Sequence, residues 1–274
     1  MSWLDALILG VLQGLTEFLP VSSSGHLVLL QKLLGIQEHD LAFDVAAHLG
    51  TLFSVLTVYR KLFWDIAANS ITGLAERKLN SSLRICLLVI VGTIPTGLIG
   101  LSLRSQFEAL FSNLPAVGFF LLCTAALLFL TRRRQYQVQA QSLTHVNEVA
   151  TMTWGQAVLI GIFQGMAIAP GISRSGSTIA SGIFVGLKGH VAAGFSFMLA
   201  VPAILGAAIL ELKDLGSIAS EVWGPLVIGF IVAYLSGLIG LHLVLRLINR
   251  GRLEIFSYYL ILVGGGTLIW SFLA

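Results

Sequence analysis

The sequence predicts an all-α polytopic membrane protein, a single membrane domain built from two inverted repeats. Three observations support this prediction: the composition, an internal repeat, and the number and length of the apolar stretches. Of the 274 residues, 56% are hydrophobic and only 11% are charged, and the mean hydropathy is +0.91. So few charges cannot solvate the surface of a globular protein of this length. We therefore expect the whole chain, 1–274, to lie in a membrane.

A glycine-rich stretch from Gly10 to Gly25 recurs 151 residues later, from Gly161 to Gly176. Each copy runs from apolar residues through a proline into a serine-glycine cluster. The identical positions are Gly10, Gln13, Gly14, Ser22, Ser24 and Gly25, which reappear as Gly161, Gln164, Gly165, Ser173, Ser175 and Gly176. The chain is therefore read as repeat one, approximately 1–131, and repeat two, approximately 154–274, joined by a cytoplasmic linker at 132–153.

Six apolar stretches are long enough to cross a hydrocarbon core of about 30 Å. They are Leu41 to Tyr59, Leu83 to Leu103, Leu114 to Thr131, Val191 to Leu210, Pro225 to Leu245 and Ile255 to Leu273. The pieces on either side of Pro20 and of Pro170 are each too short to cross. Broken backbone at membrane depth requires cover by protein or a wet cavity, so each repeated stretch is predicted to be a re-entrant helix pair. The polar connections 60–82 and 132–153 are predicted to be cytoplasmic loops, the second with a flexible glutamine-rich run at 135–141.

The basic residues predict the orientation. If both re-entrant pairs return to their side of entry, twelve of the sixteen basic residues share one face and three lie on the other, the last being Arg174. The positive-inside rule assigns the twelve to the cytoplasm and both termini to the periplasm. Three spans in each half then require the second copy to be inverted, which puts the site between the two re-entrant tips. The pI of about 9.0 reflects these short basic runs, so nucleic acid is not an expected partner.

Arg174 is the most informative residue, because an arginine at membrane depth is tolerated mainly beside a cavity, a counter-ion or a substrate. One interpretation is a buried ion pair with Glu17. The other is a phosphate site, since hydroxyl residues surround Arg174 where a new helix should begin and helix N-termini bind anions. The predicted phosphate-binding residues are Ser22, Ser24, Ser173, Arg174, Ser175, Ser177 and Thr178.

The polar residues of the first copy could supply the chemistry. Glu17 could be the counter-charge of Arg174, a ligand to a hard divalent cation, or a general base. Ser23 is either a helix cap or a nucleophile activated by His26 or Glu17. A lone histidine such as His26 is more often a satisfied buried residue than a catalyst, but its neighbours shift that balance. Asp44 and His48, four residues apart, form a lesser supporting pair, and the glycine pairs 10/14, 161/165 and 182/186 are predicted to allow close helix packing.

At these two stretches the chain resembles the undecaprenyl-diphosphate phosphatase family, the bacitracin-resistance phosphatases of bacterial inner membranes. The similar motifs are Gln13-Gly14-Leu15-Thr16-Glu17-Phe18-Leu19-Pro20-Val21-Ser22-Ser23-Ser24-Gly25-His26 and Pro170-Gly171-Ile172-Ser173-Arg174-Ser175-Gly176-Ser177-Thr178. The resemblance implies removal of the terminal phosphate from a C55 isoprenoid diphosphate on the periplasmic side, with Mg²⁺ or Ca²⁺ as cofactor. It assigns active-site roles to Glu17, Ser23, His26, Ser173, Arg174 and Thr178. Where well-known members begin the first motif with glutamate this chain has Gln13, so Glu17 is the expected metal ligand and Gln13 a further candidate.

The expected function is thus hydrolysis of a polyprenyl diphosphate, with catalytic residues Glu17, Ser23, His26 and Arg174. A lipid-phosphate flippase or anion transporter is the main alternative, because inverted repeats with broken helices are typical of transporters. A transporter would use Arg174 and the helix ends but would need no nucleophile. A phosphatidic-acid-phosphatase type of hydrolase is disfavoured, because no downstream Ser-Arg is followed by the required His and Asp. The expected partners are the lipid substrate and membrane lipids, and a homodimer is left open.

Overall fold

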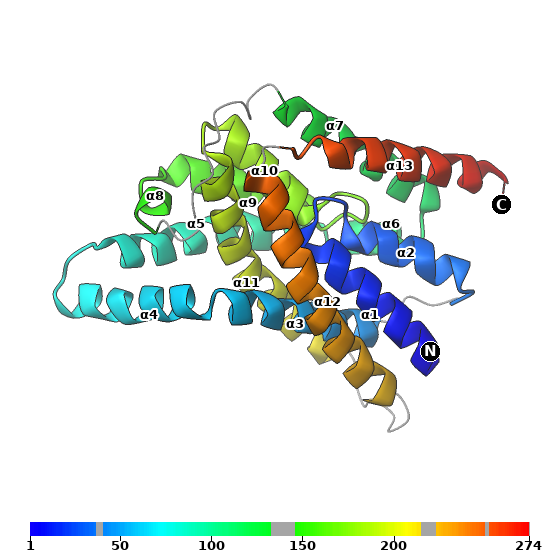
Figure 1. Cartoon of the computed structure of the whole chain (residues 1–274), viewed down its shortest axis with the longest axis horizontal. Coiled ribbons are helices and arrows are strands. Elements are labelled where there is room, and N and C mark those ends of the chain that lie inside the picture. Colours follow the sequence, from blue (N-terminus) through cyan, green and yellow to red (C-terminus); the bar gives the residue numbers. More distant parts are fainter. Residues whose placement is uncertain (37–40, 133–145, 215–222, 250–251, 274) are drawn as a thin grey trace.

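The computed structural model describes residues 1–36, 41–132, 146–214, 223–249 and 252–273. These residues form thirteen α-helices and no strand (Figure 1). The helices are α1 (Trp3–Phe18), α2 (Ser23–Leu33), α3 (Leu41–Val58), α4 (Arg60–Ala75), α5 (Ser81–Ser102), α6 (Arg104–Phe111), α7 (Leu114–Thr131), α8 (Val146–Ala150), α9 (Trp154–Met166), α10 (Arg174–Phe184), α11 (Gly189–Asp214), α12 (Trp223–Asn249) and α13 (Ile255–Leu273). The protein is an all-α polytopic membrane protein.

Five helices are long and apolar enough to cross a membrane: α5, α7, α11, α12 and α13. The remaining predicted span, Leu41 to Tyr59, corresponds to α3, which meets α4 at a bend of 75°. α3 is long and apolar enough to cross a membrane only when it is taken together with α4. The described residues therefore contain five candidate spans, or six if this bent pair counts as one. Large apolar side chains such as Leu98, Ile239 and Leu262 are exposed on these helices, as expected for surfaces that face lipid.

The prediction of a loop at 60–82 was wrong for most of its length, because residues Arg60–Ala75 form helix α4. Ile66, Ser70 and Gly73 are buried along one face of α4, while Trp64 and Ile71 are exposed. Because apolar residues occur on the exposed positions and a serine and a glycine on the buried face, the sequence has no clear amphipathic pattern there. In the predicted linker, α8 is a short helix, and the glutamine-rich run lies outside the described residues.

Helix starts show the repeat most clearly. Ser2 and Asp5 form a capping box at the start of α1, and Thr153 and Gln156 form the equivalent box at the start of α9. The same 151-residue offset relates the N-caps of the second helices, because Ser22 caps α2 and Ser173 caps α10 through equivalent bonds to a glycine amide. A serine or threonine oxygen satisfies amide groups that the first turn of a helix leaves unpaired.

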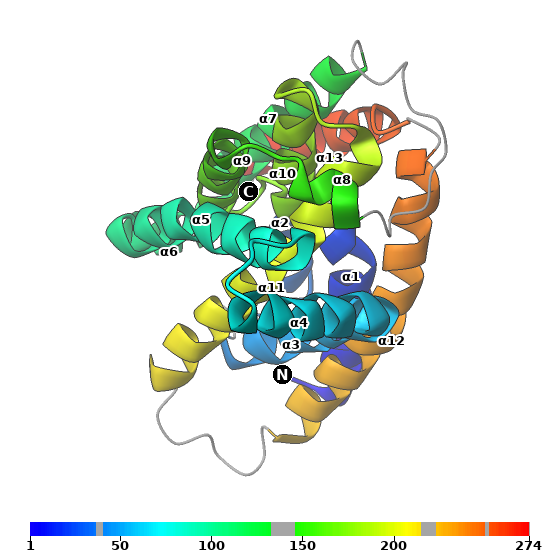
Figure 2. The ribbon, with the colours of Figure 1, turned by 90° about the vertical axis from the view of Figure 1, so that its left-hand side faces the viewer.

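The first helix of each repeat packs against a helix of the other repeat: α1 lies along α12, and α9 along α5 (Figures 1 and 2). At these crossings Gly10 faces the backbone of Gly229, and Gly161 faces that of Gly92. An added β-carbon on Gly161 would collide with Gly92 O at 2.0 Å, and one on Gly10 would lie only 3.1 Å from Gly229 O, which confirms both glycines as close-packing positions. Gly186 differs, since it ends α10 with a φ of +91° and has open space around it. The prediction of a packing role was wrong for that residue.

The two helix pairs predicted to be re-entrant, α1 with α2 and α9 with α10, determine where the site lies. α1 packs on α2, and α9 packs on α10, so each repeat contributes one helical hairpin to the interior. The breaks run from Leu19 to Ser22 and from Ala167 to Ser173. Both breaks leave a new helix starting inside the molecule, which is the condition for an internal site at helix N-termini. The inversion of the repeats relative to a membrane stays a prediction.

Candidate active site

The breaks of the two hairpins touch one another. The backbone amide of Gly171 donates to Ser22 Oγ across 3.1 Å, and a β-carbon on Gly25 would lie 3.0 Å from Gly171 Cα. Ser22 has a φ of 68°, in the left-handed region that costs a non-glycine residue about 1 kcal/mol or more. Its Oγ accepts from the amides of both Gly25 and Gly171, and these bonds offset the strain. Repeat two therefore fixes the tip of repeat one.

Thr124, on α7, fixes the tip of repeat two. Its Oγ1 donates to Gly171 O across 2.9 Å and accepts from the amide of Ser173 across 3.1 Å. The Thr124 side chain is buried, and it satisfies one carbonyl and one amide of the break that precedes α10. Sequence analysis did not identify this residue, because no motif marks a threonine in an apolar span as a support for a distant loop.

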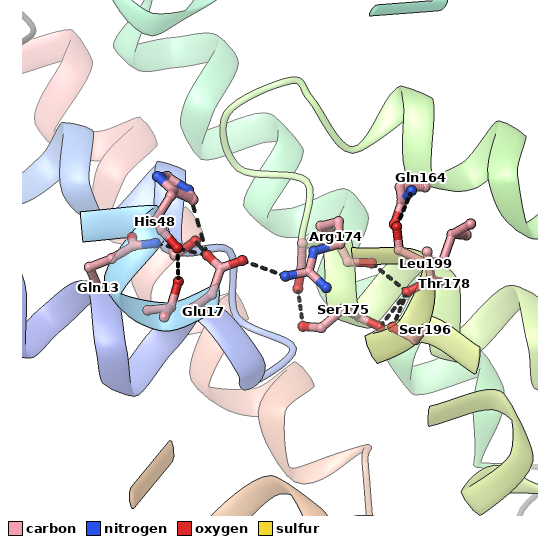
Figure 3. Close-up of polar contacts among 12 residues, drawn as sticks. Gln13, Glu17, His48, Gln164, Arg174, Ser175, Thr178, Ser196 and Leu199 are labelled. Carbon is pink, nitrogen blue, oxygen red and sulfur yellow. Dashed lines mark hydrogen bonds and ion pairs between the residues drawn. The ribbon is translucent and has the colours of Figure 1, made fainter. Parts of the chain in front are cut away.

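Glu17 is the centre of the site (Figure 3). One carboxylate oxygen, Oε1, accepts from Nη2 of Arg174, so an ion pair joins the two repeats. The other oxygen, Oε2, accepts from Gln13 Nε2 at 2.9 Å and from Ser23 Oγ at 2.7 Å. His48 Nε2 lies 3.7 Å from the same oxygen. One oxygen of the carboxylate thus binds an arginine of the second repeat, and the other binds polar side chains of the first repeat.

One guanidinium nitrogen of Arg174 has no hydrogen-bond partner among the described residues. It is the first residue of α10, and its side chain is only 15% exposed. While Nη2 binds Glu17, Nη1 is buried and has no hydrogen-bond partner among the described residues. A buried guanidinium nitrogen without a partner is costly, and a phosphate oxygen is its natural acceptor. The predicted ion pair of Arg174 with Glu17 is therefore confirmed, and the phosphate site stays a prediction that the unpaired Nη1 leaves open.

A cavity of about 540 Å³ extends from this cluster. Glu17, Ser22, Ser23, Ser24, Ser173 and Arg174 line its polar end, with Asp44 and His48 beside them. Its remaining wall includes apolar residues of α5, α6 and α11, such as Leu101, Phe107 and Ala203, and it reaches Arg104 and Glu108 on α6. A polar end with opposite charges and a long apolar wall suits an amphiphile with an anionic head.

Three of the predicted phosphate-binding residues have their hydroxyls directed into the protein. Ser175 Oγ donates to Leu19 O at 3.1 Å, and Thr178 Oγ1 contacts Arg174 O at 2.8 Å and Ser196 Oγ at 2.6 Å. Ser177 is buried, and its hydroxyl has no partner among the described residues. None of these three residues lines the cavity that the described residues form. The contacts of Ser175 and Thr178 hold α10 against Leu19 and against α11.

Both ring nitrogens of His26 have partners other than Ser23. Its Nδ1 donates to Ser22 O at 2.8 Å, and its Nε2 lies 2.7 Å from the hydroxyl of Tyr259 on α13. The two rings are stacked, with centroids 5.6 Å apart. Of the two activators predicted for Ser23, Glu17 is the one in contact with it. Tyr259 was missed by sequence analysis, because it is 233 residues from His26 along the chain.

The family resemblance implies a divalent cation, and the donor set beside Glu17 fits one in part. Gln13 Oε1 is buried next to the carboxylate and has no partner among the described residues. Those residues include no cluster of three or more His, Cys, Asp or Glu side chains that could enclose a metal. Mg²⁺ commonly takes one or two carboxylates and completes its shell with phosphate and water. The residues therefore fit a cation that a diphosphate helps to hold.

Fold and site together define a polytopic α-helical membrane protein whose two repeats share a buried cluster of opposite charges at the end of a largely apolar cavity. Comparison with known families gives its membership. The chain belongs to the family described as bacitracin resistance protein BacA, whose model matches residues 6–266.

Curated relatives align along almost the whole chain. It is 43% identical over 274 residues to the undecaprenyl-diphosphatase of Desulfosudis oleivorans, covering 97% of each protein. It is 42% identical over 283 residues to that of Desulfatibacillum aliphaticivorans, covering 99% of this chain and 100% of the relative. The undecaprenyl-diphosphatase of Methanosphaera stadtmanae is 41% identical over 283 residues and is covered to 98%.

Proposed function

We propose that this protein hydrolyses undecaprenyl diphosphate to undecaprenyl phosphate and inorganic phosphate, and so returns a lipid carrier to cell-wall polymer synthesis and confers resistance to bacitracin. The contacts of Glu17 with Ser23 and with Arg174, at the polar end of the cavity, carry this proposal. A diphosphate head fits the arginine and the two helix starts, and an isoprenoid fits the apolar wall. A cavity of about 540 Å³ accommodates the head and the nearest part of the tail, so the rest of a C55 tail lies in the bilayer.

In the proposed reaction Ser23 is the nucleophile. Its Oγ forms a bond to the terminal phosphorus while the bond from that phosphorus to the bridging oxygen breaks, and undecaprenyl phosphate leaves with that oxygen. Glu17 Oε2, which already accepts the Ser23 hydrogen bond, takes the hydroxyl proton. Water then attacks the phosphorus of the phosphoserine, and the bond from that phosphorus to Ser23 Oγ breaks. The proton held on Glu17 returns to Oγ, and inorganic phosphate leaves with the oxygen and both protons of the water.

Arg174 has two tasks in this proposal. Its free Nη1 binds a phosphate oxygen in the ground state, and its charge stabilises the negative charge that accumulates on the oxygens of the transferring group. The amides at the starts of α2 and α10 add partial positive charge from two directions. A divalent cation held by Glu17 with Gln13 would neutralise the diphosphate further.

Phosphate release by the purified protein tests the proposal directly. We expect release from farnesyl diphosphate and from longer isoprenyl diphosphates with magnesium, and loss of release with a chelator. The alternative, a lipid-phosphate flippase or anion transporter, predicts binding of the same lipids without release under any metal. No observation on the site favours that alternative, because a transporter has no use for the hydroxyl held on Glu17.

We also propose that the protein lies in the bacterial inner membrane with its site open to the periplasm. The cavity extends to Arg104 and Glu108, which the distribution of basic residues assigns to the periplasmic side. In a background lacking Cys86 and Cys123, a cysteine replacing Glu108 should react with an impermeant reagent in intact cells. One replacing Glu76 should react only after permeabilisation, and the reverse pattern would refute the orientation.

A further inference from the structure

His48 has a defined tautomer in its neutral form. Its Nδ1 lies 2.7 Å from the backbone carbonyl of Asp44, one turn earlier on α3. A carbonyl oxygen only accepts, so Nδ1 carries the proton and donates it. Nε2 of the neutral ring therefore presents a lone pair, and it is this atom that faces Glu17. A histidine that ligates a metal is normally oriented in this way, with its other ring nitrogen bonded to a carbonyl or carboxylate.

The distance between His48 Nε2 and Glu17 Oε2 also fits two ligands of one metal ion. At 3.7 Å it is longer than a hydrogen bond, and in the neutral form two lone pairs face each other there. Two ligands that each lie about 2.0 to 2.2 Å from one ion are separated by roughly 3 to 4 Å. The spacing is thus that of two ligands of a shared cation.

Gln13 and the second carboxylate oxygen of Glu17 could supply the other ligands. Gln13 contacts Glu17 Oε2 and has its own Oε1 buried without a partner among the described residues. Glu17 Oε1 forms the ion pair with Arg174, whereas Oε2 accepts from two neutral groups, Gln13 Nε2 and Ser23 Oγ, so Oε2 is the oxygen a cation can approach without displacing the guanidinium. The available donors are one carboxylate oxygen, one amide oxygen and one imidazole nitrogen.

We propose that His48 Nε2 is a direct ligand of the cation in this site, and that the imidazole shifts its preference from Mg²⁺ and Ca²⁺ towards a first-row transition metal such as Mn²⁺. Imidazole is a poor ligand for hard cations, and a site with one carboxylate has little else to hold Ca²⁺. The proposal rests on the proposed function only in that the active site uses a divalent cation.

An imidazolium ion pair is the competing explanation. If His48 were protonated at both nitrogens, its Nε2 proton would point at Glu17, and no metal could bind through that atom. The two explanations differ in whether a bound metal senses a histidine nitrogen, so a spectroscopic measurement can separate them.

Mn²⁺ alone, added to the purified full-length protein, is the probe. Electron spin echo envelope modulation of bound Mn²⁺ should show a directly coordinated ¹⁴N from imidazole. The coupling should vanish in His48→Gln and in His48→Asn, and persist in His242→Gln. His242 is a matched control, because its Nδ1 contacts Leu238 O one turn earlier at 2.6 Å while its side chain is exposed on α12 and does not line the described cavity.

Affinities give an independent readout. In His48→Gln we expect Mn²⁺ binding to weaken about 10- to 100-fold and Ca²⁺ binding to change less than about 3-fold, whereas His242→Gln should change neither. Absence of ¹⁴N coupling in the unmodified protein, or its persistence in both His48 variants, would overturn the proposal. The unmodified protein alone can give the first result, so it stands even if a variant fails to fold.

Phosphate release on the same preparations separates this proposal from the proposed function. Hydrolysis without nitrogen coupling would keep the phosphatase and remove His48 from the metal. Nitrogen coupling without hydrolysis of any isoprenyl diphosphate would keep the ligand and remove the phosphatase.

Discussion

The same glutamine has different partners in the two repeats. In repeat one, Gln13 Nε2 donates to the Glu17 carboxylate at 2.9 Å. In repeat two, its counterpart Gln164 donates to Thr96 Oγ1 at 3.2 Å and to Leu199 O at 3.3 Å. The residue equivalent to Glu17 is Ile168, so no carboxylate is available there. One substitution on a duplicated scaffold thus separates a glutamine of the active site from a glutamine that ties helices together.

The first residues of α2 and α10 differ in the same way. Ser22 and Ser173 are equivalent caps, and the residue after each cap is Ser23 in one repeat and Arg174 in the other. The two helix starts therefore present a hydroxyl from one side and a guanidinium from the other, and both groups contact Glu17. Duplication provides two similar helix starts, and divergence at one position of each makes them complementary.

Of the substitutions that test this asymmetry, Ser23→Ala should lower the rate of phosphate release the most. Loss of the proposed nucleophile is expected to lower the rate of phosphate release by about 10³-fold or more. Ser24→Ala removes a neighbouring hydroxyl whose one side-chain contact among the described residues is with Ser22 Oγ, at 3.4 Å, and should cost less than about 10-fold. Initial rates at saturating lipid measure both. A Ser23→Ala enzyme that retains most of its rate would return the nucleophile role to water or to His26.

Arg174→Lys comes next. Lysine keeps the charge but cannot bind Glu17 and a phosphate oxygen through two nitrogens of one rigid fork. We expect kcat/KM to fall about 10²- to 10³-fold while the protein stays monodisperse in detergent. The control is Arg104→Lys at the cavity rim, where an exposed ion pair with Glu108 is expected to matter less than about 3-fold. Near-normal turnover in Arg174→Lys would make the residue a structural counter-charge.

The two glutamines allow a test of the same change in both repeats. Gln13→Glu adds a carboxylate beside Glu17, so magnesium affinity should rise about 10-fold. Gln164→Glu places a carboxylate against Leu199 O in the interior, so it should lower stability by about 2 kcal/mol or more without a gain in affinity. Magnesium titrations of phosphate release and thermal unfolding distinguish the two. Glu17→Gln should abolish metal-dependent hydrolysis, and full activity in that variant would leave Glu17 as a partner of Arg174 alone.

Much of the architecture could be predicted from the sequence because its signals are local. Apolar length predicts the spans, and the breaks at Pro20 and Pro170 predict where the hairpins turn. The meeting of Glu17 with Arg174 followed from the repeat and the charge distribution together. Helix α4 was missed because its buried face is small and polar in part, so its composition resembled that of a loop.

The detailed site depends on contacts between helices, which spacing along the chain does not determine. His48 reaches Glu17 because α3 packs beside α1, and His26 reaches Tyr259 because α13 lies near α2. Neither relation has a sequence signal in a single chain. Ser175, Ser177 and Thr178 share a motif with Arg174, yet the first turn of α10 directs their hydroxyls into the protein. A motif identifies a segment, and packing decides which of its atoms reach the cavity.

The smallest expected effect concerns the scaffold that the repeats share. A β-carbon on Gly14 would meet backbone of α12, with Ala233 O at 2.5 Å and Gly237 N at 2.6 Å. On Gly165, the equivalent atom would meet the Ile99 side chain at 2.9 Å, and an isoleucine side chain can shift more easily than backbone. Gly14→Ala should therefore lower the free energy of unfolding by about 1 to 3 kcal/mol, and Gly165→Ala by less. Gly155→Ala is the control, because none of the described residues outside its own turn lies within 4 Å of the added carbon, and it should change stability by less than about 1 kcal/mol. Thermal unfolding in one detergent measures all three. Equal losses at Gly14 and Gly165 would show that the two crossings tolerate change alike, and would confine the asymmetry of the molecule to its polar site.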